Sequence, residues 1–547
     1  MNPPKPASLP RRLWQGLDKP TLQDRAMWIV PLLFGLISVL LRQDDNWDLR
    51  NYHLYNPFAW LNGKIGFDLA PAQMQSYFNP TLDLLYYGLV HALPGPLAGF
   101  VMGALHGLNF VLLLLIGRAL LPQQQPHRGR LALLLALAGM FGAGFVSQIG
   151  NTMGDNMTAL FILGALLVLL RRWQVLAAAG LALLGAGLLA GLGTGLKLTN
   201  AVYALALCLS LFALPASFLA RLRCMFTFGI GVLLGMAASA GHWYWKMWTM
   251  FGNPLFPQFN NLFHGPLASP MAVGDTNWLP QGWIERLLWP FVFALDPRQV
   301  SEIRLSLLVW PILYVAFILL GMHLLARRDR TSAPDGALRS HHAMLWLFFG
   351  LAYLVWMNLF SIYRYLVPLE LLAPLVLWLI AQRLKPGPQT ARLVAALLLV
   401  VVAAALVKSP SWGRAKWAGE SFHAEVPAIA QPEESLVFTV HGDPPMGWLV
   451  TMFPARLAFV SLSSGFPESD LYRARVGQMV AERSGPLYVM TKSDDADGTT
   501  LQRARQVLDG YGLSLVPGSC RPYRAFVGKN PFDYQLCNVN GRAGTPR

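Results

Sequence analysis

Charged side chains are scarce in this chain. Asp, Glu, Lys and Arg together make up 13% of its 547 residues, whereas soluble domains carry about 25%. Hydrophobic residues make up 54%, and the mean hydropathy is +0.42. This composition excludes a soluble globular protein and is typical of a polytopic helical membrane protein.

Acidic residues are the scarcer of the two signs, with 28 Asp and Glu against 43 Lys and Arg, for a net charge of +15. The basic residues occur in short runs between apolar segments, which is how membrane orientation is encoded, so the sequence predicts a lipid bilayer and no nucleic acid as partner. No P-loop, G-x-S-x-G or dinucleotide-binding motif occurs in a credible context, and no Cys/His spacing is typical of zinc.

Apolar runs long enough to cross or nearly cross a bilayer of about 30 Å indicate eleven spans within a transmembrane domain over residues 26–407. We expect them near 26–41, 97–117, 131–147, 156–170, 174–190, 196–218, 224–245, 305–326, 342–360, 364–382 and 392–407. The amphipathic segment 81–93 ends in Pro-Gly-Pro, and we expect it to lie along the interface.

The positive-inside rule orients these spans. The N-terminal tail, residues 1–25, is basic and is followed by an apolar run without a signal-peptide cleavage site, which predicts a retained first helix and a cytoplasmic N-terminus. Basic residues then gather in the predicted cytoplasmic loops: Arg118, Arg128, Arg130, Arg171, Arg172, Arg221, Arg223, Arg327, Arg328, Arg330, Arg339, Arg383 and Lys385. A bias towards Ala, Leu and Arg with little Lys favours a bacterial inner membrane.

Two outer loops are long, at 42–96 and 246–304, and the C-terminal region 408–547 lies on the same, periplasmic side. The 246–304 loop has no spanning run, so we expect it to be buried in protein or to line a wet cavity. Alternating and periodic patterns in the C-terminal region predict a small α/β domain, with strands in 434–440, 455–462 and 486–493 and helices in 469–485 and 500–512. Its Cys520 and Cys537 could pair in an oxidising compartment.

Ionisable residues gather at the outer ends of the apolar segments. The leading candidate is Asp48, because an outward-facing carboxylate beside a membrane cavity can act as a general base. The other candidate residues for the same outer site are Tyr52, His53, Asp155, Lys197, Tyr363 and Arg364. Arg is suited to lipid phosphate through two parallel donors, and Glu370 is a candidate ion partner for Arg364.

Each candidate also has a structural interpretation. Asp155 could cap a helix, Lys197 could extend to the interface, and Arg364 could anchor a helix end. We expect Asp44 and Asp45 only to solvate the end of the first helix. His106 and Asn109, inside the second span, are expected to make interhelical hydrogen bonds. The stretch 242–248, rich in aromatic residues, is expected to mark the membrane interface.

The stretch from Asp48 to Tyr52 (DLRNY), followed by Gly63, resembles the first outer loop of the GT-C superfamily of membrane glycosyltransferases. That superfamily includes the protein O-mannosyltransferases and the aminoarabinose transferase that acts on lipid A. Leu49 stands where Glu commonly follows the family's Asp, so a second carboxylate must come from elsewhere or be absent. The resemblance extends loosely to GLKLT at 195–199 and YRYLVP at 363–368.

The resemblance implies a GT-C-like fold and the transfer of a sugar from a polyprenyl phosphate or pyrophosphate to a glycan, lipid or protein acceptor. Asp48 would be the base of an inverting reaction and Asp155 the second acid. Lys197 and Arg364 would bind phosphate, and Tyr52, His53 and Tyr363 would contact substrate. Because the first loop lacks a DxD motif, a role for a divalent cation, Mg²⁺ or Mn²⁺, stays open. The alternatives are a transporter or flippase of a lipid-linked or anionic solute, and a non-catalytic assembly factor.

Overall fold

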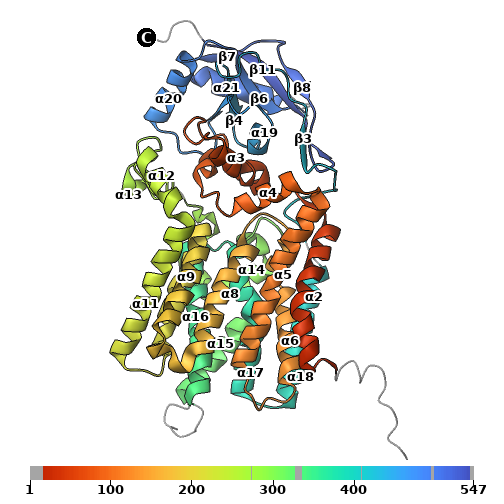
Figure 1. Cartoon of the computed structure of the whole chain (residues 1–547), viewed down its shortest axis with the longest axis vertical. Helices are drawn as coiled ribbons and strands as arrows, with labels where there is room; N and C mark the ends of the chain where they lie inside the picture. Colours follow the sequence, from red (N-terminus) through yellow and green to blue (C-terminus); the bar gives the residue numbers. More distant parts are fainter. Residues whose placement is uncertain (1–15, 273, 327–335, 408–409, 494–497, 542–547) are drawn as a thin grey trace, which may run out of the picture.

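A computed structural model describes residues 16–272, 274–326, 336–407, 410–493 and 498–541 of the chain. Most of the predicted N-terminal tail therefore lies outside the described residues, as do Arg327, Arg328 and Arg330 and the side chain of Arg339. Figure 1 shows a bundle of long helices at one end of the molecule and the C-terminal sheets at the other.

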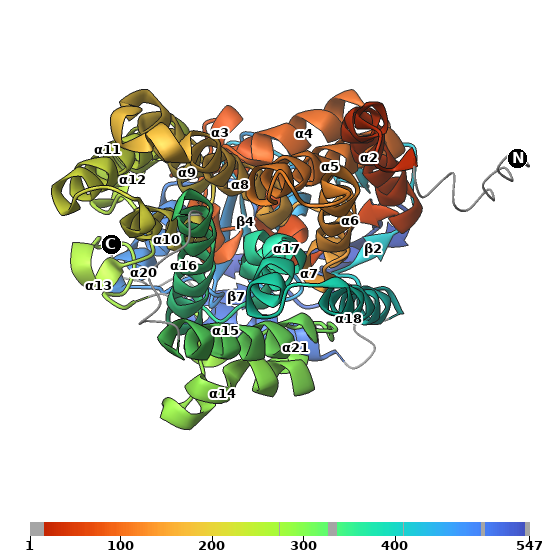
Figure 2. The ribbon, with the colours of Figure 1, turned by 90° about the horizontal axis from the view of Figure 1, so that it is seen from below.

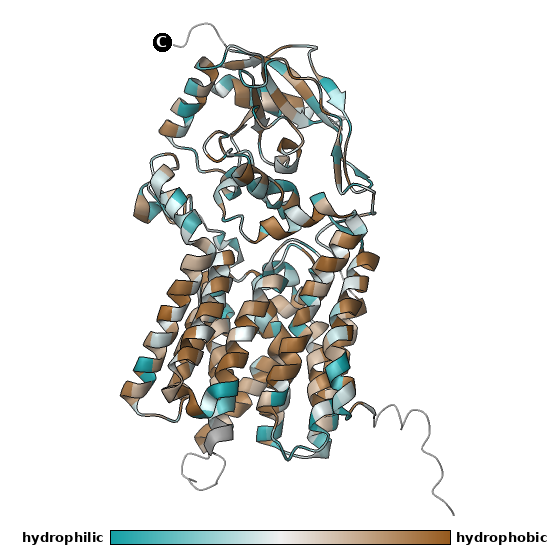
Figure 3. Ribbon diagram, viewed as in Figure 1, coloured by the Kyte–Doolittle hydropathy of each residue, from teal (hydrophilic) through white to brown (hydrophobic). Residues whose placement is uncertain are grey.

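The bundle is built from α2 (Pro20–Leu41), α5 (Gly95–Leu120), α6 (Arg128–Met140), α8 (Asp155–Arg172), α9 (Gly180–Leu196), α10 (Ala201–Ser210), α11 (Phe218–Met236), α15 (Val309–Ala326), α16 (Gly336–Leu359), α17 (Val367–Leu384) and α18 (Pro388–Val407). Figure 3 shows that hydrophobic residues dominate these helices, with hydrophilic residues concentrated towards their lower ends. Figure 2, seen from below, shows α17 with other helices around it. Its span is the most buried of the candidate spans, with 83% of the residues inside the protein.

Within the described residues, eight helical segments are long and apolar enough to cross a membrane. They are Pro20–Leu41, Gly95–Leu120, Asp155–Ala178, Phe218–Phe251, Val309–Ala326, Ser340–Leu359, Tyr363–Leu384 and Pro388–Val407. The other three predicted spans overlap the shorter helices α6, α9 and α10, so eleven crossings stay a prediction. Several boundaries were wrong. The first helix already begins at Pro20, the third predicted span is helical only to Met140 before the separate α7, and the helix α10 of the sixth is Ala201–Ser210. The fifth segment is helical over 180–196 because a 3₁₀ turn, Trp173–Ala178, precedes it.

Glycines bring α9 and α11 into close contact. A Cβ atom at Gly187 or Gly191 would lie 2.1 Å from a backbone oxygen of α11, and one at Gly235 would lie 2.2 Å from a backbone oxygen of α9. Small residues allow such an approach between membrane helices. The glycine-rich segment before Lys197 therefore serves helix packing.

The ends of the bundle are chemically different. At the start of α2, Asp18 lies 3.3 Å from Arg130 and Asp24 lies 3.5 Å from Arg118. The end of α2 instead leads into β1 (Gln43–Asp44), which pairs with β2 (Arg414–Ala415) of the C-terminal region. The loop that carries Arg118 and Arg130 and the C-terminal sheets thus lie at opposite ends of the first helix, as the sequence predicts.

The first outer loop contains η1 (Leu49–His53), a π-helical turn, followed by α3 (Tyr55–Leu61), η2 (Gln73–Tyr77) and α4 (Asp83–Ala92). Figure 1 shows α3 and α4 between the bundle and the sheets. The segment 81–93 is therefore a helix that does not run along the bundle. The first residue of α4, Asp83, is buried, which the amphipathic pattern of the segment does not predict.

The second outer loop begins with α12 (His242–Phe251), which continues the α11 span through the π-helical turn η6 (Ala237–Gly241). It then forms α13 (Asn260–Phe263), η7 (Thr276–Trp278), α14 (Gly282–Leu295) and η8 (Pro297–Gln299). Trp245 and Trp248 are exposed as expected for interfacial anchors, whereas Trp243 is buried and donates to the carbonyl of Tyr77 at 2.9 Å. The loop is thus partly buried against protein.

The C-terminal region forms a six-stranded sheet in the order β5-β4-β6-β11-β7, with β8 paired to β11. Its strands are β4 (Leu436–Val440), β5 (Ala458–Leu462), β6 (Leu487–Lys492), β7 (Leu513–Leu515), β8 (Arg521–Tyr523) and β11 (Tyr534–Gly541). β4 is parallel to β5 and β6, and β11 is antiparallel to its partners. The helices are α19 (Gly447–Val450), α20 (Asp470–Ala481) and α21 (Thr499–Gly510). Every strand and helix predicted here is confirmed. A smaller sheet joins β3 (Phe422–Ala424), β9 (Ala525–Val527) and β10 (Asn530–Pro531).

The first outer loop completes this C-terminal region. The amide of Leu69 donates to Phe459 at 2.8 Å, and the amide of Ser461 donates to Leu69 at 2.9 Å, so the loop extends the edge strand β5. Tyr55 and Phe58 belong to the same hydrophobic core as Phe459. The loop 42–96 and the C-terminal domain therefore share one core, and the edge of the sheet is covered.

Cys520 and Cys537 form a disulfide beside the β8–β11 pair. Closing a loop of this length stabilises a domain by about 2–4 kcal/mol. We expect the double Cys→Ser variant of the full chain to show a lower melting temperature in detergent, with dithiothreitol lowering the melting temperature of the wild type but not of the variant. The control is Cys208→Ser, which removes a thiol outside any disulfide. Equal melting temperatures for wild type and double variant would contradict the prediction.

Candidate functional site

Charged side chains from four segments meet between the bundle and the C-terminal sheet. We call this group the outer charge cluster and define it as Asp48, His53, Asp83, Asp155, Lys197 and Arg364. It consists of three contacting pairs, and electrostatic coupling between members of different pairs joins them into one site.

The first pair joins Arg364 Nη1 to Asp48 Oδ2 at 2.8 Å, across 316 residues of sequence. Asp48 directly precedes η1, and Arg364 lies in a 3₁₀ turn, η9 (Tyr363–Leu366), at the start of α17. The side chains are only 13% and 17% exposed, respectively. Burial favours the neutral form of Asp48, but Arg364, and after it His53 and Lys197, outweigh burial and hold the pKa of Asp48 below its usual value.

Aromatic rings flank the guanidinium of Arg364. Its carbon lies 5.4 Å from the ring centroid of Tyr365 and 5.9 Å from that of Trp412, a geometry in which a cation is attracted to the ring face. Arg364 Nε is buried and has no hydrogen-bond partner among the described residues. One donor of this cation is thus free for another anion.

The second pair joins Lys197 Nζ to Asp155 Oδ1 at 2.6 Å, and Lys197 also donates to the carbonyl of Met153 at 2.7 Å. Lys197 lies just past the end of α9, not inside the next helix, and it points into the protein rather than extending to the interface. Asp155 is the first residue of α8, but its side chain caps no backbone amide. The capping and interface interpretations of these two residues are therefore wrong.

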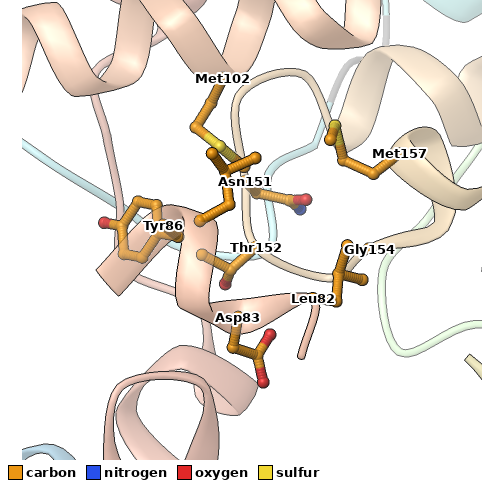
Figure 4. Close-up of a pocket in the computed structure, with 9 residues that line it drawn as sticks. Leu82, Asp83, Tyr86, Met102, Asn151, Thr152, Gly154 and Met157 are labelled. Carbon is orange, nitrogen blue, oxygen red and sulfur yellow. The ribbon is translucent and has the colours of Figure 1, made fainter. Parts of the chain in front are cut away.

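The third pair joins His53 Nδ1 to Asp83 Oδ1 at 2.7 Å, and both side chains are buried. The ring of Tyr52 lies 4.1 Å from that of His53. Burial raises the pKa of Asp83, although His53 and Lys197 act in the opposite direction. Figure 4 shows Asp83 beside a small cavity with Tyr86, Met102 and Asn151. The cavity volume of about 10 Å³ has room for one water molecule.

The cluster has three carboxylates and, besides His53, two basic side chains. Asp48, Asp83 and Asp155 face Lys197 and Arg364. A phosphate that enters the cluster must therefore compete with a carboxylate for each basic side chain. The site can thus hold an anion between two cations while a carboxylate or an imidazole accepts a proton.

No family model matches this chain, and no curated protein matches it. The geometry of the cluster therefore carries the functional argument, and membership of the GT-C superfamily stays a resemblance of short motifs.

Tyr363 does not join the cluster, contrary to the prediction. Tyr363 is buried. Its hydroxyl donates to Glu370 and accepts a hydrogen bond of 2.9 Å from Trp310 Nε1. Glu370 in turn accepts from the amides of Gly144 at 3.0 Å and Phe145 at 2.9 Å, at the start of the short helix α7 (Ala143–Ser147). The predicted Glu370–Arg364 pair is wrong because Glu370 satisfies these backbone donors.

We expected Asp44 and Asp45 only to solvate the end of the first helix, but the structure shows a different role for both. Asp44 is 3% exposed and accepts from Asn46 and from the amide and hydroxyl of Thr152 at 2.8–2.9 Å. Burial raises the pKa of Asp44 despite these bonds and the nearby Arg414. Asp45 pairs with Arg50 at 2.6 Å. Both residues join the first outer loop to neighbouring segments.

Sequence reasoning missed Asp83, Tyr365 and Trp412. The available signal for Asp83 was a single acid within the otherwise apolar stretch LDLLYYGLV, which we interpreted only as interfacial. The expected interhelical bond of Asn109 is confirmed, because Asn109 donates to the carbonyl of Asn156 in α8 at 2.8 Å. His106 instead accepts from the amide of Gly150, in the turn before α8, at 3.1 Å.

A divalent cation finds no ready ligand set. Among the described residues, no group of three or more His, Cys, Asp or Glu could hold a metal ion. The carboxylates of the cluster contact Arg364, Lys197 and His53 instead of converging on one point. These residues do not fit Mg²⁺ or Mn²⁺.

Proposed function

We propose that the protein is a membrane glycosyltransferase that takes a sugar from a polyprenyl phosphate or pyrophosphate and transfers it, with inversion, to an acceptor on the outer face of a bacterial inner membrane. The N-terminus would be cytoplasmic and the C-terminal domain periplasmic. The observation that carries the proposal is the contact between Asp48 and Arg364 at the end of an apolar bundle. A carboxylate is able to accept a proton and a guanidinium is able to bind phosphate, and here the two are in contact.

The bundle explains why the donor would be a lipid. The polyprenyl tail would lie in the bilayer, and its phosphate would meet Lys197 and Arg364 at the outer end of the helices. In the ligand-free cluster each cation is paired with a carboxylate. A phosphate that reaches Arg364 competes with Asp48 for the guanidinium, and the free Nε offers it a second donor.

This exchange of partners would activate Asp48. Its pKa is held below the usual value chiefly by Arg364, acting against burial. When the guanidinium turns to phosphate, burial favours the protonated carboxyl, so Asp48 becomes a stronger base only after the donor has bound. The empty enzyme would thus keep its base weak.

In the proposed reaction Asp48 takes the proton of the acceptor hydroxyl while that oxygen attacks the anomeric carbon. The bond between the anomeric carbon and the phosphate oxygen breaks, and the phosphate leaves with the electron pair. Arg364 and Lys197 stabilise the charge on the leaving phosphate, so this group needs cations more than a general acid. Asp155 would hold Lys197 in position. Direct attack from the opposite face inverts the anomeric centre.

The experiment is a transfer assay with purified full-length protein in liposomes, polyprenyl-phosphate-linked sugars as donors, and glycan, lipid and peptide acceptors. We expect Asp48→Asn to lower kcat by about 10²–10⁴-fold, the usual contribution of a general base. Asp296→Asn is the matched control, because the Asp296 side chain is 40% exposed in the second outer loop and forms its ion pair with nearby Arg298. Both variants should elute from size exclusion as the wild type does.

Two outcomes would contradict the proposal. Full turnover by Asp48→Asn would remove this residue from proton transfer. Movement of intact donor between the two leaflets, without release of polyprenyl phosphate, would favour the transporter or flippase.

A further inference from the structure

The pair formed by His53 and Asp83 is not used in the reaction above. His53 Nδ1 lies 2.7 Å from the Asp83 carboxylate, and His53 Nε2 is buried with no hydrogen-bond partner among the described residues. A histidine with a purely structural role normally satisfies both ring nitrogens when buried. The free Nε2 therefore needs an explanation.

Local structure brings His53 to the same face as Asp48. The turn between them, Leu49–His53, is a π-helix, and hydrogen bonds in a π-helix join residues five apart in sequence. Asp48 and His53 are five apart, so they lie one turn apart on this helix. The π-helical turn thus places an imidazole next to the base.

Two carboxylates interact with His53. Asp83 of α4 contacts its Nδ1, and Asp48, at the start of η1, interacts with it electrostatically. The cations of the cluster act on these carboxylates: Arg364 and Lys197 on Asp48, and Lys197 on Asp83. Two carboxylates are therefore close to the imidazole, and they stabilise the imidazolium that forms when Nε2 accepts a proton.

We propose that His53 is the onward proton acceptor of the transfer reaction, held in its orientation and tautomer by Asp83 as a positioning residue. This inference rests on the proposed function. The proton leaves the acceptor hydroxyl for Asp48 and passes through one bridging water molecule to His53 Nε2, and the imidazolium is stabilised by Asp83. The imidazolium of His53 releases the proton to water after the phosphate has left, so that no net charge accumulates in the site over a catalytic cycle.

The relay gives the proton on Asp48 a way out after the transfer. With Arg364 beside it, Asp48 binds a proton weakly because its pKa is lowered. When the phosphate departs and Arg364 returns to Asp48, the proton must leave the carboxyl. His53 provides a nearby acceptor, and Asp83 supplies the second carboxylate that Leu49 does not.

The test is the pH dependence of kcat for the wild type, His53→Gln and Asp83→Asn, with His264→Gln, an exposed outer-loop histidine, as control. The wild-type rate should fall towards acid pH because a protonated imidazole cannot accept a proton. His53→Gln should lower kcat by about 10²-fold and abolish this acid limb. Asp83→Asn should lower kcat and move the limb to lower pH, because the anion that stabilises the imidazolium is lost.

Chemical rescue separates a proton acceptor from a structural residue. Added imidazole should restore part of the activity of His53→Ala but none of that of Asp48→Asn. An active wild type with an unchanged acid limb in His53→Gln and Asp83→Asn would overturn the relay and leave the proposed function intact. Absence of transfer by the wild type with every donor would instead overturn the proposed function and the relay together.

Discussion

Replacing Arg364 with Gln is expected to lower the rate of sugar transfer by about 10³–10⁵-fold, the range for an arginine that stabilises charge on a phosphate in the transition state. The guanidinium contacts Asp48 at 2.8 Å and has a free, buried Nε. The substitution therefore removes the cation that would meet the leaving phosphate and the group that positions the base. Initial rates in liposomes, normalised to monodisperse protein, measure the effect.

Two further variants make this prediction specific. Arg364→Lys keeps the charge but loses the planar fork, so it should recover only part of the rate. The double variant Asp48→Asn/Arg364→Gln should be more stable than Arg364→Gln, because no unpaired carboxylate is buried, but it should stay inactive. Arg298→Gln, at an exposed arginine of the second outer loop, should behave as the wild type. A raised KM with an unchanged kcat would show that Arg364 binds substrate and transition state equally.

Replacing Lys64 with Met is expected to destabilise the protein by about 3–5 kcal/mol, the cost of breaking a buried ion pair on one side. Lys64 is 1% exposed. Its Nζ lies 3.1 Å from Asp68 and donates to the carbonyl of Leu457 at 2.7 Å. Asp68 in turn accepts from the amide of Phe459 at 3.0 Å. The substitution leaves a buried carboxylate where the first outer loop meets β5, so thermal unfolding and proteolysis of the full chain should report the loss.

The loss should depend on pH. Burial raises the pKa of Asp68 in the folded protein even though Lys64 lowers it, and removal of Lys64 raises this pKa further. A carboxyl whose folded pKa is above its unfolded value stabilises the fold at low pH and loses this contribution as the pH rises. Lys64→Met should therefore be closest to the wild type in mildly acidic buffer.

Two comparisons test the explanation. Lys64→Met/Asp68→Asn should regain stability, because the neutral amide needs no ion partner and its oxygen still accepts from the amide of Phe459. Lys416→Met, at an exposed lysine of the C-terminal region, should change the melting temperature little. A destabilisation of Lys64→Met that stays constant over pH, or a double variant less stable than the single one, would show that the buried charge is not the cause.

The sequence predicted which residues of the candidate site lie at the same end of the bundle. It did not predict which of these residues contact one another. Asp48, Lys197 and Arg364 each stand at the end of an apolar segment, and loop charges placed these ends on one side. That these residues lie close together could therefore be predicted from the sequence. The ion partner of Arg364 could not be predicted, because Glu370 lies nearer in sequence but faces the backbone amides of Gly144 and Phe145.

The contact made by Asp83 could not be predicted from the sequence either. Its segment was expected to lie along the interface, and it forms the short helix α4, which is not among the candidate spans. Amphipathicity says only which face of such a segment is apolar. That its carboxylate meets His53 depends on how α4 packs against the first outer loop. Likewise, the strands and helices after 434 could be read from alternation, but the joining of the 42–96 loop to β5 could not.

The amino-acid sequence alone determined that this is an apolar, polytopic helical chain with a mixed α/β region at its C-terminus, because hydropathy and periodicity are properties of short segments. Only the tertiary structure decided which carboxylate meets which cation, that Tyr363 belongs to the interior, and that the first outer loop and the C-terminal sheet share a core. These contacts join residues hundreds of positions apart. Their geometry depends on helix packing and on the need to satisfy every buried charge, which no local pattern records.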